Sequence, residues 1–396
     1  MRKRLRLIVL GAMGRIPFAG MAWEALHYLE GFRRLGHDAY YVEDTWNWPY
    51  YAPEHTRVAD AARATANYIS RVMTWCGMPD RWAYRCTAQR GRIYGLSPSQ
   101  FAKLFKEADA LVNLTGSTIL HDEHLGVPIR IYLQTDPGAG EIAVAKGNRA
   151  TIKMLRAHTH FFNFAENFGA PDCGLPPQPF DYRFTRQPIV LEWFTPPGTA
   201  RGNGRWRGAL RFTTVGNWKQ TGEDIEWNGE TYTWSKHHEF LKFLDLPRRI
   251  GQPIELALAS ITKKETRMLT SYGWRVVEAY PLTTDILPYR DYIFSSDGEF
   301  TVAKDQNVRL RSGWFSERSA SYLCAGRPVI TQDTGFGRVI PTGEGLFAFN
   351  TMEEIVAAFE AIKTDYKRHS RAARAIAKEY FQAEKVLKTL IDDVGA

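Results

Sequence analysis

The stretch SGWFSERSASYLCAGRPVITQDTGFG, residues 312–337, indicates the fold of this 396-residue chain more directly than any other part of the sequence. Ser316 is a favourable N-cap, Gly326 suits the left-handed position that ends a helix, and Pro328 prevents the helix from continuing. The stretch therefore predicts a short helix followed by a buried strand. Arg318 is unusual in it, because the first turn of a helix is the positive end of the macrodipole and favours acids.

The first half of the chain predicts a parallel β-sheet with helices between its strands. Its apolar segments end in small or polar residues, as parallel strands do at their carboxyl edge. An insertion at residues 45–100 is crowded with Trp and Tyr, which indicates core packing or rings beside a ligand. The expected elements are strands at 6–14, 38–44, 108–117, 129–138 and 160–169, and a helix at 21–35.

The second half repeats this pattern after a segment rich in Pro and Gly at residues 194–208, which predicts a domain boundary. Thr351 and Glu354 predict a capping box at the start of a helical region that continues to Ile391. The expected elements are strands at 211–218 and 254–260, one or two strands within 292–304, and a helix near 236–244.

The predicted fold class is therefore α/β, with two Rossmann-like domains facing across a cleft. Residues 1–195 form the first domain and residues 209–375 the second. The C-terminal helix, residues 376–396, is expected to pack back on the first domain.

Composition narrows the class of protein. With 44% hydrophobic and 24% charged residues the chain is globular rather than disordered, and its net charge of +8 suits an anionic ligand. The four cysteines lack zinc spacing and fit reduced thiols, and the apolar run after MRKRLR is too short for a signal peptide. No apolar run is long enough to cross a bilayer. We expect a cytoplasmic protein without a transmembrane segment, and peripheral membrane contact stays open.

Ligands of parallel sheets bind beyond the carboxyl ends of the strands, which locates the candidate site of the second half. The hydroxyls, free N–H groups and arginine at the start of the 316–324 helix suit a diphosphate. The alternative is a surface pair of Arg318 with Glu317 or Asp305. The candidate donor-side residues are Gly216, Asn217, Lys219, Ser316, Glu317, Arg318, Ser319, Asp333, Thr334 and Gly335.

In the first half, Asp136 follows a strand and is the best-placed acid for taking a proton from an acceptor hydroxyl. His121 and Glu166 are the other candidates, and an Asx-turn is the structural alternative for Asp136. The segment GAMGR, which contains Gly14, lacks the three-glycine spacing of dinucleotide-binding loops, so it gives little support to NAD binding. Gly116 and Ser117 complete the candidate acceptor-side loops.

The second half resembles the donor domain of GT-B glycosyltransferases. The resemblance lies in CAGRPVI, residues 324–330, and in VGNWK, residues 215–219. Over residues 315–337 the chain is most similar to bacterial family-four-like and spore-coat-protein-like glycosyltransferases. The resemblance implies a UDP-, GDP- or TDP-sugar donor, transfer to a small-molecule, glycan or natural-product acceptor, and no metal or other cofactor.

One departure from that family concerns stereochemistry. Retaining members carry two glutamates eight positions apart, where this chain has Gly313 and Ser321. Retention is therefore not implied, and inversion with Asp136 as base is an equal alternative. A non-catalytic nucleotide or sugar binder, and an epimerase or phosphorylase on the same fold, also stay open. Nucleic-acid binding is not expected, because the basic residues are scattered among acids.

Overall fold

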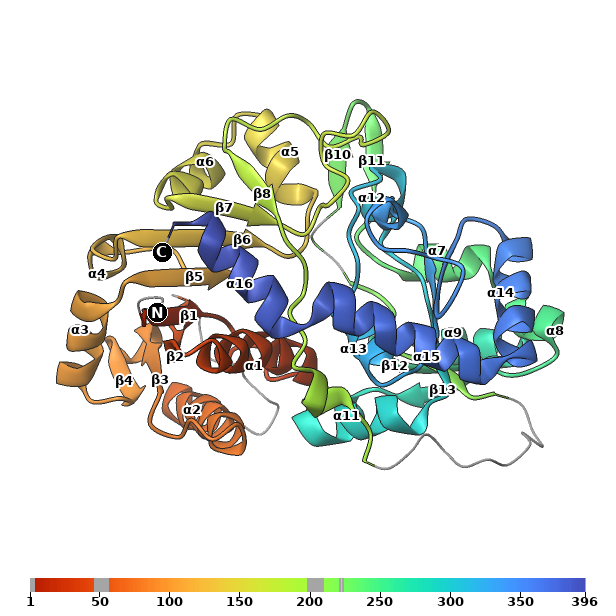
Figure 1. Ribbon diagram of the computed structural model, residues 1–396, viewed down its shortest axis with the longest axis horizontal. Coiled ribbons are helices and arrows are strands. Elements are labelled where there is room, and N and C mark those ends of the chain that lie inside the picture. Colours follow the sequence, from red (N-terminus) through yellow and green to blue (C-terminus); the bar gives the residue numbers. More distant parts are fainter. Residues whose placement is uncertain (1–3, 46–56, 198–209, 221, 223, 396) are drawn as a thin grey trace.

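The computed structural model describes residues 4–45, 57–197, 210–220, 222 and 224–395. The chain forms two parallel α/β sheets side by side, each covered by helices, and a long C-terminal helical segment runs across both (Figure 1). The first sheet has the strand order β4-β3-β2-β1-β5-β6-β7-β8 and the second has the order β13-β12-β9-β14-β15-β16.

The first sheet is parallel except for the pairing of β3 with β4 at one edge. Its central strands are buried on both faces, which is why they read as continuous apolar runs. The strands are β1 Arg6–Leu10, β2 Asp38–Glu43, β3 Trp82–Cys86, β4 Arg92–Gly95, β5 Ala110–Leu114, β6 Ile129–Gln134, β7 His160–Asn163 and β8 Tyr182–Phe184.

The second sheet is entirely parallel, and a small antiparallel hairpin follows its first strand. The sheet strands are β9 Phe212–Asn217, β12 Glu255–Ala259, β13 Arg275–Glu278, β14 Gly298–Thr301, β15 Val329–Gln332 and β16 Leu346–Phe349, and the hairpin is β10 Ile225–Trp227 and β11 Glu230–Tyr232.

The helices connect the strands and cover the sheets. In the first domain they are α1 Ala19–Arg34, α2 Val58–Trp75, η1 Thr87–Gln89, α3 Pro98–Glu107, α4 Asp122–Leu125, α5 Ala139–Ala145 and α6 Arg149–Arg156. The rest are η2 Leu191–Phe194, α7 His237–Lys242, α8 Leu246–Ile250, α9 Lys263–Ser271, α10 Tyr280–Thr283, α11 Ile286–Ser295, α12 Asp305–Arg309, α13 Glu317–Cys324, η3 Phe336–Arg338, α14 Met352–Thr364, α15 Tyr366–Ile376, η4 Ala377–Phe381 and α16 Ala383–Asp393.

Local sequence signals explain several of these boundaries. Gly326 follows α13 with φ of 69°, in the left-handed region expected of it. Thr351 caps α14, accepting from the backbone N–H of Glu354, as the sequence predicts. Of the one or two strands expected within residues 292–304, one forms, β14, and residues 292–295 end helix α11. The aromatic Tyr292 is buried from a helix there, so its apolar character did not indicate a strand.

Two chain crossings join the domains and are hydrogen-bonded to each other. The first crossing is the segment at residues 189–194, which we call the linker. The N–H of Ile189 donates to Phe381 O at 2.6 Å, and its carbonyl accepts from Ala383 N at 2.9 Å. The helical segment bends at Gln382, where ψ of 123° interrupts the helix, and α16 then packs on α1 (Figure 1). A Cβ on Gly31 would lie 2.4 Å from Leu387 Cδ1 and 3.1 Å from Ala383 Cβ, so a larger residue there would force Leu387 to move.

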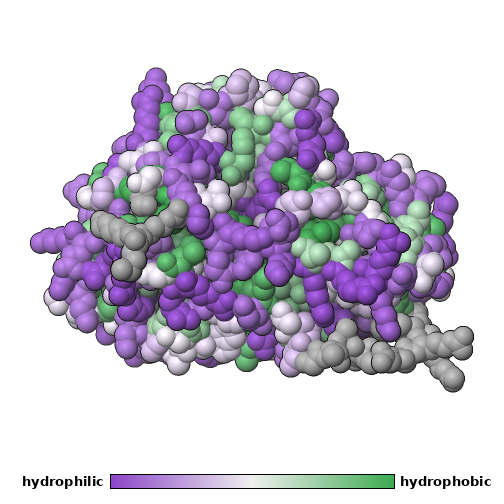
Figure 2. Space-filling view, viewed as in Figure 1, coloured by the Kyte–Doolittle hydropathy of each residue, from purple (hydrophilic) through white to green (hydrophobic). Residues whose placement is uncertain are grey.

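One apolar cluster continues through both domains. Trp23 of α1, Phe194 of the linker, Tyr289 of α11 and Phe381 beside the second crossing all belong to it. Hydrophilic side chains cover most of the face that carries the crossings (Figure 2). Within the residues that the structure describes, none of the helices is both long and apolar enough to span a bilayer.

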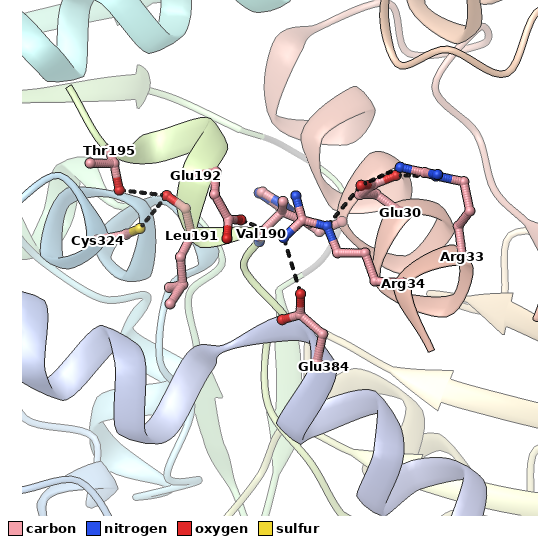
Figure 3. A network of polar contacts seen from close by, with 10 residues as sticks. Glu30, Arg33, Arg34, Val190, Leu191, Glu192, Thr195, Cys324 and Glu384 are labelled. Carbon is pink, nitrogen blue, oxygen red and sulfur yellow. Dashed lines mark hydrogen bonds and ion pairs between the residues drawn. The ribbon is translucent and has the colours of Figure 1, made fainter. Parts of the chain in front are cut away.

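Arg34, at the end of α1, binds both crossings, the linker and α16 (Figure 3). Its guanidinium donates to Glu30 at 2.7 Å, to Glu384 of α16 at 3.0 Å and to Glu192 of the linker. Among the described residues its neighbour Arg33 donates only to Glu30, at 2.6 and 2.8 Å, and it is 57% exposed, compared with 24% for Arg34. Arg34 thus holds three segments together where Arg33 holds none.

We expect the substitution Arg34→Met to lower the free energy of unfolding by roughly 1–3 kcal/mol, because it removes charge-assisted hydrogen bonds to three segments. The matched control Arg33→Met should change it by less than about 1 kcal/mol, as exposed pairs do. Urea denaturation of the two variants checks this. Equal losses would show that the crossings do not depend on Arg34.

Candidate functional site

The carboxyl ends of the two sheets meet at Asp136 and Lys304. Asp136 follows β6 of the first sheet, Lys304 follows β14 of the second, and Lys304 Nζ lies 2.5 Å from Asp136 Oδ2. Beside this ion pair, Trp314 Nε1 donates to the carbonyl of Thr135 at 2.9 Å. The loops that follow strands of the two sheets are therefore in direct contact in this structure.

Arg318 lies at the carboxyl edge of the second sheet, as the sequence predicts, and its guanidinium is bound by protein atoms. Nε donates to Glu299 Oε1 at 2.5 Å, Nη1 to Val215 O at 2.7 Å and Nη2 to Thr301 Oγ1 at 2.8 Å. Glu299 is fully buried and Arg318 is only 13% exposed. The anion that neutralises this arginine is therefore Glu299 of β14, and neither Glu317 nor Asp305.

Two lysines add positive charge beside Arg318. Lys304 Nζ lies 3.0 Å from the ring centroid of Trp234, and Lys236 Nζ lies 5.5 Å from that of Trp314. Burial, together with the charges of Arg318 and Lys304, lowers the pKa of Lys236 to about 7. An anion bound here would favour the charged form of Lys236.

Three carboxylates, Glu24, Asp136 and Glu317, lie near one another beside this group. Burial raises the pKa of Glu24, on α1, to about 7, the charge of Asp136 adds to the rise, and a hydrogen bond from Thr135 opposes it. Burial likewise raises the pKa of Glu317 to about 8, with Glu24 adding to it and Arg318 opposing it. The six residues Glu24, Asp136, Lys236, Lys304, Glu317 and Arg318 form what we call the interdomain charge cluster.

His27 links this cluster to the linker. Its Nδ1 accepts from the N–H of Val190 at 3.0 Å, which places the ring proton on Nε2, 3.8 Å from Glu317 Oε1. Burial lowers the pKa of His27 to about 3, with Arg34 adding to the effect. His27 is therefore neutral and presents an N–H to Glu317.

Several buried polar atoms around the cluster have no hydrogen-bond partner among the described residues. They include Glu299 Oε2, Ser319 Oγ and Asp136 Oδ1. Buried polar groups are nearly always hydrogen-bonded in proteins, so such atoms indicate a place for polar ligand groups or water. Ser319, in the first turn of α13, is one of the predicted donor-side residues.

The other predicted donor-side residues have local partners. Lys219 pairs with Glu265 of α9 at 2.7 Å, Asp333 pairs with Arg311 at 3.0 Å, and Thr334 Oγ1 donates to Trp314 O at 2.6 Å. Gly335, at φ of 94°, lies so near Asn167 that a Cβ would be 2.8 Å from Nδ2.

The remaining donor-side positions have no side-chain partner of this kind among the residues that the structure describes. Gly216 lies beside Arg318, and Asn217 is exposed at the end of β9. Ser316 precedes α13 without a side-chain cap bond.

Gly14, one of the predicted acceptor-side positions, belongs to a loop whose amides are occupied. The N–H groups of Gly14 and Arg15 donate to the buried carboxylate of Glu43 at 2.7 and 2.6 Å, where a dinucleotide-binding loop would hold phosphate. Burial raises the pKa of Glu43 to about 7 against these hydrogen bonds.

The remaining acceptor-side positions form a tight turn after β5. Gly116 has φ of 62° and packs against Tyr132, and Ser117 Oγ donates to Asn113 Oδ1 at 3.4 Å.

The structure does not join His121 and Glu166 to Asp136 through any contact it records. His121 precedes α4 and lies beside His124, whose Nε2 is 3.2 Å from Asp44. Glu166 pairs with Arg186, which in turn lies over the ring of Tyr380. In the part of the chain that the structure describes, no three His, Cys, Asp or Glu side chains gather as a metal site would need.

Sequence reasoning missed Glu24, Lys236 and Glu299. Glu24 lies within an amphipathic helix, and Glu299 lies within a strand that reads as apolar, so neither position carries a local signal. Lys236 directly precedes α7, the helix that follows the first strand of the second domain, and its place at a helix start near a strand end was a usable signal.

Comparison with solved structures identifies the architecture. The chain is similar to Anabaena HepE in complex with UDP and glucose, with a TM-score of 0.56 and 10% identity over 99% of this chain and 100% of that chain. An α-glucosyltransferase in complex with UDP and a 13-mer DNA gives a TM-score of 0.58 and 11% identity over the full length of both chains. AviGT4, a glycosyltransferase involved in avilamycin A biosynthesis, gives a TM-score of 0.51 and 11% identity over 98% of this chain and 96% of that chain.

The chain has the GT-B fold. No protein-family model matches the sequence, and no curated protein matches it significantly. The predicted pair of Rossmann-like domains with a returning C-terminal helix is confirmed.

We expect Glu317→Gln to stabilise the protein at alkaline pH. The raised pKa of Glu317 means that the wild type loses stability as pH rises from about 4.5 to about 8, and glutamine cannot ionise. The gain should be small at pH 5 and on the order of 2 kcal/mol at pH 8.5.

Thermal melting across that pH range, with the exposed Glu278→Gln as control, checks this expectation. Parallel curves for Glu317→Gln and wild type would contradict it.

Proposed function

We propose that the protein is a glycosyltransferase that uses a nucleoside diphosphate sugar. The observation that carries the proposal is the interdomain charge cluster: Lys236, Lys304 and Arg318 lie at the carboxyl edge of the second sheet, facing carboxylates of the first. Ligands of such sheets bind at this edge. The GT-B fold supports the proposal, since HepE and the α-glucosyltransferase were solved with UDP over the same full-length architecture.

The transfer needs positive charge beside the diphosphate and a carboxylate beside the acceptor hydroxyl. As the glycosidic bond breaks, the diphosphate oxygen gains negative charge, which the side chains of Lys236 and Lys304 would stabilise beside the N-terminus of α13. At the same time an acceptor hydroxyl must lose a proton to a carboxylate of the first domain. In this proposal these cations carry out the neutralisation without a metal ion.

Asp136 belongs to this proposed site, held by Lys304 on the acceptor side. Ser319, with its buried hydroxyl, and the first turn of α13 belong to the diphosphate side. Arg318 holds the start of α13 in place on that side through its hydrogen bond to Glu299. Glu317, the first residue of α13, completes the proposed site on the diphosphate side.

UDP is the nucleotide we propose, because the HepE and α-glucosyltransferase structures both contain it. We propose a small-molecule, glycan or natural-product acceptor, as HepE was solved with glucose and AviGT4 serves avilamycin A biosynthesis. The α-glucosyltransferase was solved with DNA, so DNA belongs among the acceptors to be tested.

The proposal predicts that UDP raises the melting temperature, because a ligand that binds only the native state stabilises it. A screen of UDP, GDP, TDP and ADP identifies the nucleotide, and UDP release from UDP-glucose then distinguishes an enzyme from a binder. No shift with any of the four would contradict the proposed function.

Lys236 gives the sharper test of the diphosphate site, because removing Arg318 would leave the buried Glu299 without its partner. Lys236→Met should weaken UDP binding roughly 10- to 100-fold, as expected for a lost charged hydrogen bond. Lys263→Met, at an exposed position, is the control and should have no effect.

Calorimetry at several pH values adds a second readout for Lys236. Because Lys236 has a pKa of about 7 without ligand, wild-type affinity should fall as pH rises from 6 to 9, and the variant's should fall less. Unchanged affinity in Lys236→Met would remove the lysine from the site.

A further inference from the structure

Two carboxylates of the first domain, Glu24 and Asp136, belong to the interdomain charge cluster. We infer that Glu24 is the catalytic base of the proposed transfer, and that Asp136 is a positioning residue that holds Lys304. The inference rests on the proposed function. It follows from which of the carboxylates is not already paired with a cation.

Asp136 is occupied on the oxygen that faces the second domain. Lys304 Nζ lies 2.5 Å from Oδ2, and Lys304 is 9% exposed, with its ammonium also over the ring of Trp234. Protonation of Asp136 would remove the negative charge that faces this buried ammonium, which is unfavourable. Asp136 therefore suits the task of fixing Lys304 beside the leaving diphosphate.

Glu317 is the third carboxylate, and it lies on the wrong element for the acceptor. It begins α13, next to Arg318, and accepts from Ser321 Oγ at 3.4 Å on the same helix. His27 presents its N–H to the same carboxylate from 3.8 Å. It therefore belongs to the diphosphate side, where a departing group needs positive charge and not a base.

Glu24 lies on α1, on the face of that helix that meets the second domain. Its neighbours on this face show the contact: Trp23 Nε1 donates to Ile286 O at 3.1 Å, and His27 approaches Glu317. Glu24 is half-buried, receives a hydrogen bond from the Thr135 hydroxyl, and is in no ion pair within the described residues. It is thus within reach of both domains while its carboxylate is not neutralised by a cation.

The surroundings of Glu24 favour proton uptake near neutral pH. The titratable groups that face it are Asp136 after β6, Glu317 on α13, and Tyr28 and neutral His27 on α1. Burial and the negative charge of Asp136 raise its pKa to about 7. A base with a pKa near the working pH both accepts a proton from a hydroxyl and returns it to water.

In the inferred step the acceptor hydroxyl gives its proton to the Glu24 carboxylate. Its oxygen forms a bond to the anomeric carbon, and the bond from that carbon to the diphosphate oxygen breaks. UDP leaves with the electron pair of that bond, stabilised by Lys236 and Lys304. Water then takes the proton from Glu24, so atoms and charge balance without another reactant.

Glu24→Gln tests the inference, with UDP-glucose as the donor and water as the hydroxyl acceptor. We expect UDP release to fall roughly 100- to 10,000-fold, the range of general-base catalysis, while UDP affinity changes less than about threefold. The rise of kcat/KM with pH near 7 should also disappear. Thermal melting confirms that the variant is folded, and Glu278→Gln is the matched control.

Azide separates a base from a structural residue, because it is a nucleophile that has no proton to lose. With sodium azide, Glu24→Gln should turn over UDP-glucose within about tenfold of the wild type with azide. Asp136→Asn should instead weaken donor binding and keep the pH dependence. Full hydrolysis by Glu24→Gln, or a loss that azide does not restore, would overturn the inference. A wild type that neither binds UDP nor consumes UDP-glucose would show that the proposed function itself is wrong.

Discussion

The buried ion pair of Arg318 with Glu299 is the interaction on which the rest of the structure depends. It joins the first turn of α13 to β14, and the same guanidinium reaches the carbonyl of Val215 on β9. Two adjacent strands and a helix are therefore fixed by one side chain at the carboxyl edge of the second sheet. A cation is stable at this helix start because a carboxylate and a carbonyl face it, which outweighs the unfavourable dipole.

Fixing that helix start also fixes the electrostatics between the domains. With Arg318 committed to Glu299, the positive charge available to a ligand comes from Lys236 and Lys304. Burial raises the pKa of two nearby carboxylates, Glu24 on α1 and Glu317 on α13. The contact surface of the two domains is thus held in a state that an anion, or a change in protonation, will alter.

The sequence was sufficient for the fold because each fold signal is local. The left-handed Gly326, the capping box of Thr351 and Glu354, and the polar ends of apolar strands depend on neighbouring residues only. The site was less predictable. Arg318 was found by its odd position, but its partner Glu299 is 19 positions earlier in a strand, and Glu24 faces Asp136 from over 100 positions away. No local pattern carries such pairings, which arise only when strand ends and helix faces are brought together.

Helix α1 connects the candidate site to the domain crossings. Its N-terminal part carries Glu24 and His27 toward α13, and its last residue, Arg34, binds the linker and α16. Val190 of the linker sets the tautomer of His27, so the N–H that faces Glu317 is fixed by the segment that joins the domains. A rotation of the second domain about these crossings would carry Glu317 and Lys304 away from α1 and Asp136 while the linker stayed on α1. Opening the site and separating its opposed charges are therefore one movement in this fold.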